Sequence, residues 1–244
     1  MECRTARCAS PARGLVLHTT RERADVWVLT ETHDDFNPGH AFSRSSASGR
    51  DGLHEEKHRW VTLWSRFPLD PLPTSDPARS AAARIRPESG PPFIVFGTVL
   101  PWLGSQWRGF PSKGSVAFRA ALSVQSADWM AIRRNDPDVE LFVLGDLNQD
   151  LVRGGPRYYG SRANRIALES ALLDAGLVAL TAADGDPIRR DSAPSACIDH
   201  ICARSDSSWR VESTARWPNA PRPDRRLSDH FGLSVTLLPR ANHS

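Results

Sequence analysis

The chain has 244 residues, which suits one large α/β domain or two small ones and allows a sizeable buried core. Hydrophobic residues make up 40% and charged residues 24% of the sequence, as in soluble globular proteins, and no stretch approaches the ~20 consecutive apolar residues of a membrane span. A net charge of +3 is compatible with a phosphate-bearing substrate but excludes the concentrated charge of a DNA-wrapping protein.

Neither the start of the chain nor its cysteines indicate export or a metal site. The first residues, MECRTARCASPARG, are basic but lack the continuous apolar segment of a secretory signal. Cys197 and Cys202 have an odd separation, which along a strand sends two side chains to opposite faces. The cysteines are therefore expected to be reduced thiols in a cytoplasmic protein.

In the first half of the chain, apolar stretches predict short strands separated by polar turns. A helix is expected over residues 13–23, and the polar residues 34–58 are typical of a long surface loop. One strand is expected to pair with the next across the proline-rich turn PLDPLPTSDP, bringing Ala81–Ile85 beside Trp60–Trp64. The predicted strands are Asp25–Thr30, Trp60–Trp64, Ala81–Ile85 and Phe93–Leu100.

The second half adds two helices and four strands. Apolar residues between Ser115 and Arg134 recur at spacings of three and four, which predicts one buried helical face. A second helix is expected between an N-cap at Ser161 and a stop at Gly176. The strands are Leu141–Leu144, Cys197–Ala203, Trp209–Ala215 and Gly232–Leu238. Because strands outnumber helices, an α/β (α+β) fold of two packed sheets flanked by helices fits better than a doubly wound parallel sheet.

Several of these strands end in polar residues of types that take part in catalysis or metal binding. The strand before Gly145 leads directly into Asp146 and Asn148, and ligands bind at strand ends in open α/β sheets. The alternative is an ordinary polar turn, because Asp and Asn are common turn formers. Singly, the other candidates also have structural explanations as solvated strand ends, half-buried polar residues or turn caps. They are Glu31, Asp199, His200, Asp229 and His230.

Four motifs occur in the order typical of one superfamily: VLTE ending at Glu31, GDLN at 145–148, IDHI at 198–201 and SDHFGL at 228–233. Together they resemble the endonuclease/exonuclease/phosphatase superfamily, which includes DNase I-like nucleases, abasic-site endonucleases, sphingomyelinases and inositol polyphosphate phosphatases. LWSRFPL (63–69) and FGTVLPW (96–102) are similar to further family segments, so the resemblance covers residues 13–238. It implies a DNase I-like four-layer sandwich of two mixed β-sheets flanked by helices.

The resemblance implies divalent-metal chemistry on a phosphoester. Carboxylate and amide oxygens suit Mg²⁺ or Mn²⁺, and Glu31 is expected to be the principal ligand, with Asp229 as a nearby or water-mediated one. Asp146 would orient or deprotonate the attacking water, and Asn148 would position that water or hydrogen-bond the phosphate.

The last two motifs imply a paired carboxylate and imidazole. His230 would contact a non-bridging phosphate oxygen, and Asp199 would hold its ring, so these two side chains are expected within hydrogen-bond reach of each other. His200 faces the opposite side of its strand and is expected to be structural.

Two departures from the family pattern suggest a divergent, bacterial-type member. Residues 1–12 supply no asparagine and no apolar strand, so the family's first strand is expected to be missing and this segment disordered or atypical, with the catalytic domain at 13–240. Such a truncated chain is expected to work poorly, with Asp25–Thr30 lacking a neighbour on one side. The second departure is Leu100, which stands where the family often has a histidine.

The leading interpretation is a monomeric, metal-dependent phosphoesterase that cleaves phosphodiesters, nucleic acid among them, ahead of phosphomonoesters. Arg108 and Tyr158 are expected to bind the substrate, within a wider set of basic and aromatic side chains that could follow a phosphate backbone and stack on bases. That set is Arg108, Lys113, Arg153, Arg157, Arg162, Trp102, Trp107, Tyr158 and Tyr159. The alternatives are solvated arginines and packed aromatics, a catalytically impaired remnant that only binds, and an unrelated α/β binding protein with coincidental motifs.

Overall fold

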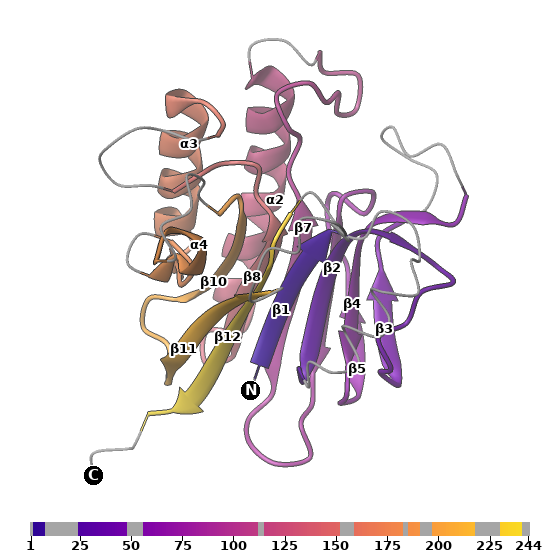
Figure 1. Ribbon diagram of the computed structural model, residues 1–244, viewed down its shortest axis with the longest axis vertical. Helices are drawn as coiled ribbons and strands as arrows, with labels where there is room; N and C mark the ends of the chain where they lie inside the picture. Colours follow the sequence, from indigo (N-terminus) through magenta and orange to yellow (C-terminus); the bar gives the residue numbers. More distant parts are fainter. Residues whose placement is uncertain are drawn as a thin grey trace.

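Two mixed β-sheets packed face to face form the centre of the protein (Figure 1). The computed structural model describes residues 2–7, 24–47, 56–111, 115–151, 159–182, 185–190, 197–217 and 230–240. Within these residues each sheet has six strands, in the orders β11-β12-β1-β2-β4-β3 and β5-β6-β7-β8-β10-β9. The α/β sandwich expected from the sequence is confirmed.

The first sheet contains β1 (Glu2–Arg7), β2 (Val26–His33), β3 (Phe42–Ser45), β4 (His58–Ser65), β11 (Trp209–Trp217) and β12 (Gly232–Pro239). The second contains β5 (Leu69–Leu72), β6 (Ser80–Ile85), β7 (Phe93–Val99), β8 (Glu140–Asp146), β9 (Leu177–Ala179) and β10 (Asp199–Arg204). The helices among the described residues are α2 (Val116–Asn135), α3 (Arg162–Asp174) and α4 (Pro187–Arg190).

The expectation of a missing first strand is wrong. Strand β1, with the sequence ECRTAR, pairs in parallel with β2 and antiparallel with β12, so it lies inside the first sheet (Figure 1). The β2 strand therefore has neighbours on both sides, β1 and β4. ECRTAR contains no apolar run, but backbone hydrogen bonds to two partner strands define a strand whatever its side chains, and strand propensity depends strongly on such context.

One predicted strand pairing is also wrong. Strand β6 pairs with β5 and β7, whereas β4 belongs to the other sheet. The proline-rich connection contains β5 itself, which takes the hairpin position beside β6, so the chain crosses from one sheet to the other between β4 and β5.

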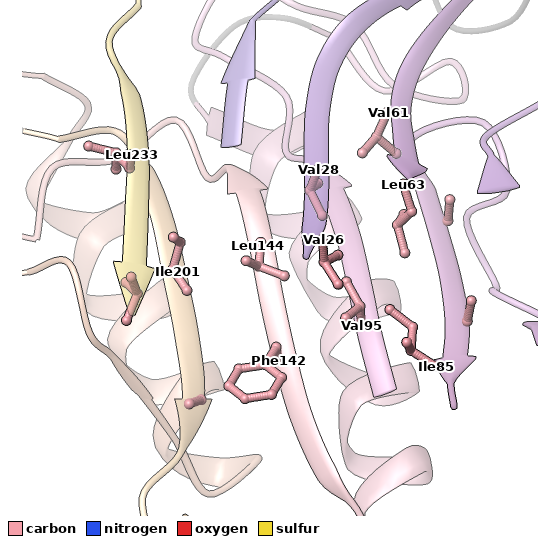
Figure 2. Packing of buried hydrophobic residues seen from close by; sticks show 14 of the residues in the cluster. Val26, Val28, Val61, Leu63, Ile85, Val95, Phe142, Leu144, Ile201 and Leu233 are labelled. Atoms are coloured by element: carbon pink, nitrogen blue, oxygen red, sulfur yellow. The ribbon is translucent and has the colours of Figure 1, made fainter. Parts of the chain in front are cut away.

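The main core lies between the two sheets (Figure 2). Val28 and Leu63 of the first sheet face Val95 and Leu144 of the second, and all four side chains are fully buried. A second core packs α2 and α3 against the outer face of the second sheet, through residues such as Trp129. The outer face of the first sheet buries a smaller cluster: Ala24, Trp27, Leu29, Phe36 and Trp64.

Local sequence signals place the two long helices well. Ser161 caps α3 by accepting a hydrogen bond from the Asn164 backbone nitrogen at 3.1 Å, and Gly176 follows the helix with a φ of 65°. The buried face of α2 includes Phe118, Leu122 and Trp129, as the spacing predicted. The helix expected at residues 13–23 lies outside the described residues. No helix in the described part of the chain is long and apolar enough to cross a membrane.

Gly145 lets β8 approach β7 closely, in a conformation that other residues avoid. Its φ is 135°, and a Cβ there would lie 2.0 Å from the carbonyl oxygen of Thr98. Adding a methyl group should therefore force two backbones apart as well as strain φ. We expect Gly145→Ala to lower the free energy of unfolding by about 2–5 kcal/mol in urea titrations.

The matched control is Gly39→Ala. Gly39 also has a positive φ, 93°, but a Cβ there would meet nothing within 4 Å, so only backbone strain of about 1–2 kcal/mol is expected. Equal losses in the two variants would show that the approach to Thr98 has no special cost.

Candidate functional site

The strand ends that carry the predicted site residues meet at one edge of the sandwich. In Figure 2, β2 runs from Val26 to Val28 in the same direction as β8, from Phe142 to Leu144, while β10 and β12 run the opposite way. The carboxyl ends of β2 and β8 therefore lie at the same edge as the amino ends of β10 and β12. Close to these strand ends lie Glu31, Asp146, Asp199 and His230.

Two buried carboxylates face each other across this edge. Asp146 ends β8 and Asp199 begins β10, and the two are directly paired in the antiparallel register, so their side chains share one face. They are only 5% and 3% exposed. Like charges so placed repel and lose hydration, which makes the position attractive to a cation or to a protonated imidazole.

His230 provides such a partner. Its Nδ1 lies 2.7 Å from Asp199 Oδ2, so the contact expected from the sequence is present. Asp146, Asp199 and His230 each offer one ligand atom within 4.8 Å of the others. The bond from Nδ1 fixes the orientation of the ring and points Nε2 away from Asp199.

Asn148 is held rigidly beside this group. Its backbone nitrogen donates to Asp146 Oδ1 at 2.9 Å, and its side-chain Nδ2 donates to the carbonyl oxygen of Leu100 at 2.8 Å. The Leu100 nitrogen in turn donates to the Asp146 carbonyl at 2.9 Å. Asn148 has a φ of 51°, and strained backbone of this kind is concentrated at functional sites. The backbone of Leu100, where the family often has a histidine, thus positions the amide.

The polar run after β8 is not a solvated turn. Gln149 and Asp150 are 1% and 0% exposed, and both hold the segment that leads to α3. Gln149 Oε1 accepts from the Ser161 nitrogen at 3.0 Å, and Asp150 Oδ2 accepts from the Tyr159 nitrogen at 2.6 Å. These buried polar groups fix the backbone that follows Asn148. No local sequence pattern indicated that they would be buried.

His200 belongs to the same supporting layer. Its Nε2 lies 2.9 Å from the Gln149 carbonyl oxygen, and burial lowers the pKa of the imidazole. Because a carbonyl can only accept, Nε2 carries the proton of a neutral ring. The structural role expected for His200 agrees with this geometry.

The two expected metal ligands are placed less completely. Glu31 lies near the carboxyl end of β2, is partly buried and has a φ of 52°. This left-handed backbone interrupts the regular alternation of side chains along the strand. Glu31 is not part of the three-residue group described above, and Asp229 lies outside the described residues.

The structure contains donors suited to a divalent cation. Asp146 and Asp199 supply carboxylate oxygens close together, and Asp199 Oδ1 is buried with no hydrogen-bond partner among the described residues. A buried carboxylate oxygen without a partner is costly unless a water or an ion satisfies it. The residues present therefore fit a hard cation such as Mg²⁺ or Mn²⁺.

The residues expected to bind the substrate are only partly available. The Arg108 guanidinium lies 4.7 Å from the ring centre of Trp107, and its Nη2 donates to the Ser75 carbonyl. Trp107 is 2% exposed, so for this residue the structure supports the alternative of a packed aromatic side chain. Trp102, in contrast, is 50% exposed. Tyr158, Lys113, Arg153 and Arg157 lie outside the described residues.

Two buried charged residues that the sequence did not single out anchor the segment after β7. Asp76 Oδ2 accepts hydrogen bonds from Trp107 Nε1 and Gln125 Nε2, each at 2.9 Å. Arg79 is fully buried, stacks 4.0 Å from the ring centre of Trp60, and donates to Ser105 Oγ at 2.8 Å. These partners are far apart in the sequence, so no local pattern could have predicted them.

Comparisons with known proteins agree with this fold. Three solved structures share the fold: the human Nocturnin catalytic domain with bound sulfate (17% identity, TM-score 0.66, 98% of this chain and 94% of that one), a mannosyl-6-phosphatase from Bacteroides thetaiotaomicron (14%, 0.62, 98% and 99%) and a 3′-5′ exonuclease from Neisseria meningitidis (18%, 0.60, 97% and 99%). No curated protein matches the chain.

The sequence profile of the Endonuclease/Exonuclease/phosphatase family matches residues 4–230. The match begins within β1 and ends at His230, so it contains the first three sequence motifs in full and the Ser-Asp-His of the fourth. With the paired aspartates, the histidine and the asparagine gathered at one edge of its sandwich, this chain belongs to the Endonuclease/Exonuclease/phosphatase family, a family of phosphoester hydrolases.

Proposed function

We propose that this protein hydrolyses phosphodiesters by the attack of a water molecule, with the help of a divalent cation. The observation that carries the proposal is the group of Asp146, Asp199 and His230, whose ligand atoms lie within 4.8 Å of one another. A negatively charged phosphodiester repels nucleophiles, so an enzyme must neutralise its charge and activate water at the same place. This group contains carboxylates, which can activate water, and an imidazole, which can neutralise charge on the phosphate.

Each side chain has a distinct part in the proposal. Asp146 accepts the proton of the attacking water, or orients that water, while Asn148 holds the water or the phosphate with its amide. His230 presents Nε2 to a non-bridging phosphate oxygen. Asp199 is a positioning residue, because its contact with Nδ1 fixes the imidazole and stabilises its charged form.

A divalent cation, Mg²⁺ or Mn²⁺, would be held by carboxylate oxygens at this edge. Glu31 and Asp229 remain the proposed ligands, with Asp146 and Asp199 as further oxygen donors. When bound, the cation would supply charge neutralisation of the phosphate and a lower pKa for a nearby water.

The proposed substrate is a phosphodiester, with nucleic acid as the first candidate, bound by a monomer. Arg108 and Tyr158 are proposed to contact it. The alternative that the chain is a catalytically impaired remnant depended largely on a missing central strand. Strand β1 occupies that position, between β2 and β12. Hydrolysis is therefore preferred over binding alone, and a phosphomonoester is the alternative substrate.

Metal removal is the direct test. We expect EDTA to reduce hydrolysis of bis(p-nitrophenyl) phosphate to background and Mg²⁺ or Mn²⁺ to restore it, because the opposed carboxylates alone cannot neutralise the phosphate. p-Nitrophenyl phosphate, a monoester, is assayed beside it. Full turnover in EDTA by protein shown to be metal-free would reject the metal, and a preference for the monoester would reject the substrate class.

A further inference from the structure

A large aromatic side chain is exposed in the loop that begins at Leu100. Trp102 is 50% exposed, whereas Trp27, Trp60, Trp64, Trp107 and Trp129 are 0–7% exposed. Tryptophan is enriched where proteins contact other molecules, because its ring is apolar and its N–H is polar, so an exposed indole suggests such a contact. Trp102 lies in the segment that follows β7 and leads towards α2 (Figure 1).

Its position ties it to the catalytic edge. Trp102 comes two residues after Leu100, whose backbone bonds both Asp146 and Asn148. Two residues of extended chain span at most about 7 Å, so the Trp102 backbone starts within one side-chain length of the residues that hold Asn148.

The indole is also held in a defined place. The Ser105 nitrogen donates to the Trp102 carbonyl at 2.9 Å, which closes a turn, and a Cβ on Gly104 would lie 2.1 Å from the Trp102 ring. The ring therefore lies directly against the glycine backbone and leaves its remaining surface to solvent.

Hydrogen bonds to buried charged residues hold the segment that carries Trp102. Ser105 is bonded to the buried Arg79, and Trp107 is bonded to the buried Asp76. With Leu100 held before Trp102 and Ser105 held after it, the loop loses less conformational entropy on binding a ligand. A rigid, half-exposed aromatic ring beside a phosphate site is suited to stacking, because every nucleobase has an aromatic face.

We infer that Trp102 is a specificity-determining residue that stacks on a nucleobase of a single-stranded substrate, next to the phosphate that is cleaved. This inference rests on the phosphodiester hydrolysis proposed above and names its substrate class. The neighbouring exposed side chains Leu103 and Phe110, each 42% exposed, form the apolar margin of the same loop.

The test compares two esters that share a leaving group. One is the p-nitrophenyl ester of thymidine 5′-phosphate, which has a base, and the other is methyl p-nitrophenyl phosphate, which has none. Trp102→Ala should lower kcat/KM for the thymidine ester about 5- to 100-fold, the scale of one lost stacking contact, and leave the methyl ester unchanged. Gly104→Ala, which displaces the ring without removing it, should show a smaller loss of the same kind.

The matched control is Leu103→Ala, which removes the neighbouring exposed apolar side chain from the same loop. It should leave both esters unchanged. Equal losses on both esters, or no loss on either, in Trp102→Ala would overturn the inference, and the latter result would favour a protein partner for this apolar surface.

A second measurement separates this inference from the proposed function. Binding of a fluorescein-labelled oligothymidylate is followed by fluorescence anisotropy in EDTA, where no hydrolysis occurs. A Kd at least about 5-fold weaker in Trp102→Ala supports the stacking role of Trp102. This holds even if no variant cleaves either ester, because that result would reject only the proposed hydrolysis. An unchanged Kd rejects the stacking role of Trp102.

Discussion

Replacing His230 with alanine should lower kcat by about two to four orders of magnitude, the scale of losing a positioned acid or charge stabiliser. The imidazole is held by Asp199 at 2.7 Å and lies beside Asp146, so its loss removes the group that we propose to contact the phosphate. The fold should survive, because His230 precedes β12 and is not part of the core. Steady-state kinetics on the diester and thermal unfolding would be measured together.

The positioning role of Asp199 gives this prediction a second readout. Asp199→Asn keeps the shape of the side chain but removes the charge that favours an imidazolium. We expect a smaller loss of kcat than in His230→Ala, because the imidazole stays in place but loses its anionic partner. His40→Ala is the control, since His40 bonds the Ala24 backbone on the outer side of the first sheet. Loss of activity in His40→Ala equal to that in His230→Ala would contradict the assignment.

Asp146→Asn should reduce kcat by about 10³-fold or more, because an amide cannot accept the proton of the attacking water and is a poorer cation ligand. Its oxygen can still accept the Asn148 backbone hydrogen bond, so the local geometry is kept. Removing one of two opposed buried carboxylates also removes repulsion towards Asp199. We therefore expect the melting temperature to stay constant or rise while activity falls.

The matched control lies four residues further along the same run. Asp150→Asn alters a fully buried carboxylate that accepts from the Tyr159 nitrogen and lies 3.7 Å from Arg165 Nη1. Its loss should lower stability, and the folded protein should keep kcat within about 10-fold, because Asp150 supports the site without facing it. The opposite pattern, with Asp146→Asn destabilised and active, would show that Asp146 is structural.

Contacts between segments far apart in the chain explain why β1 was not predicted from the sequence. ECRTAR lacks an apolar run, so nothing local identified it as a strand, yet β12 and β2 supply backbone partners on both sides. Similarly, the sequence left base stacking and packing both open for Trp107, because an aromatic side chain in a loop gives no sign of its burial. Asp76, 31 positions away, accepts its indole hydrogen bond.

Local patterns predicted most strand and helix positions, the class of fold and the four motifs, because hydrophobic period, capping residues and polar strand ends are local properties. Three features became visible only in the folded chain: Asp146 and Asp199 oppose each other, the Leu100 carbonyl fixes Asn148, and Trp102 is the exposed indole of its loop. Each of these depends on the register and packing of segments distant in the chain. Those contacts are set by which strands become neighbours, and a single sequence carries no local signal for that choice.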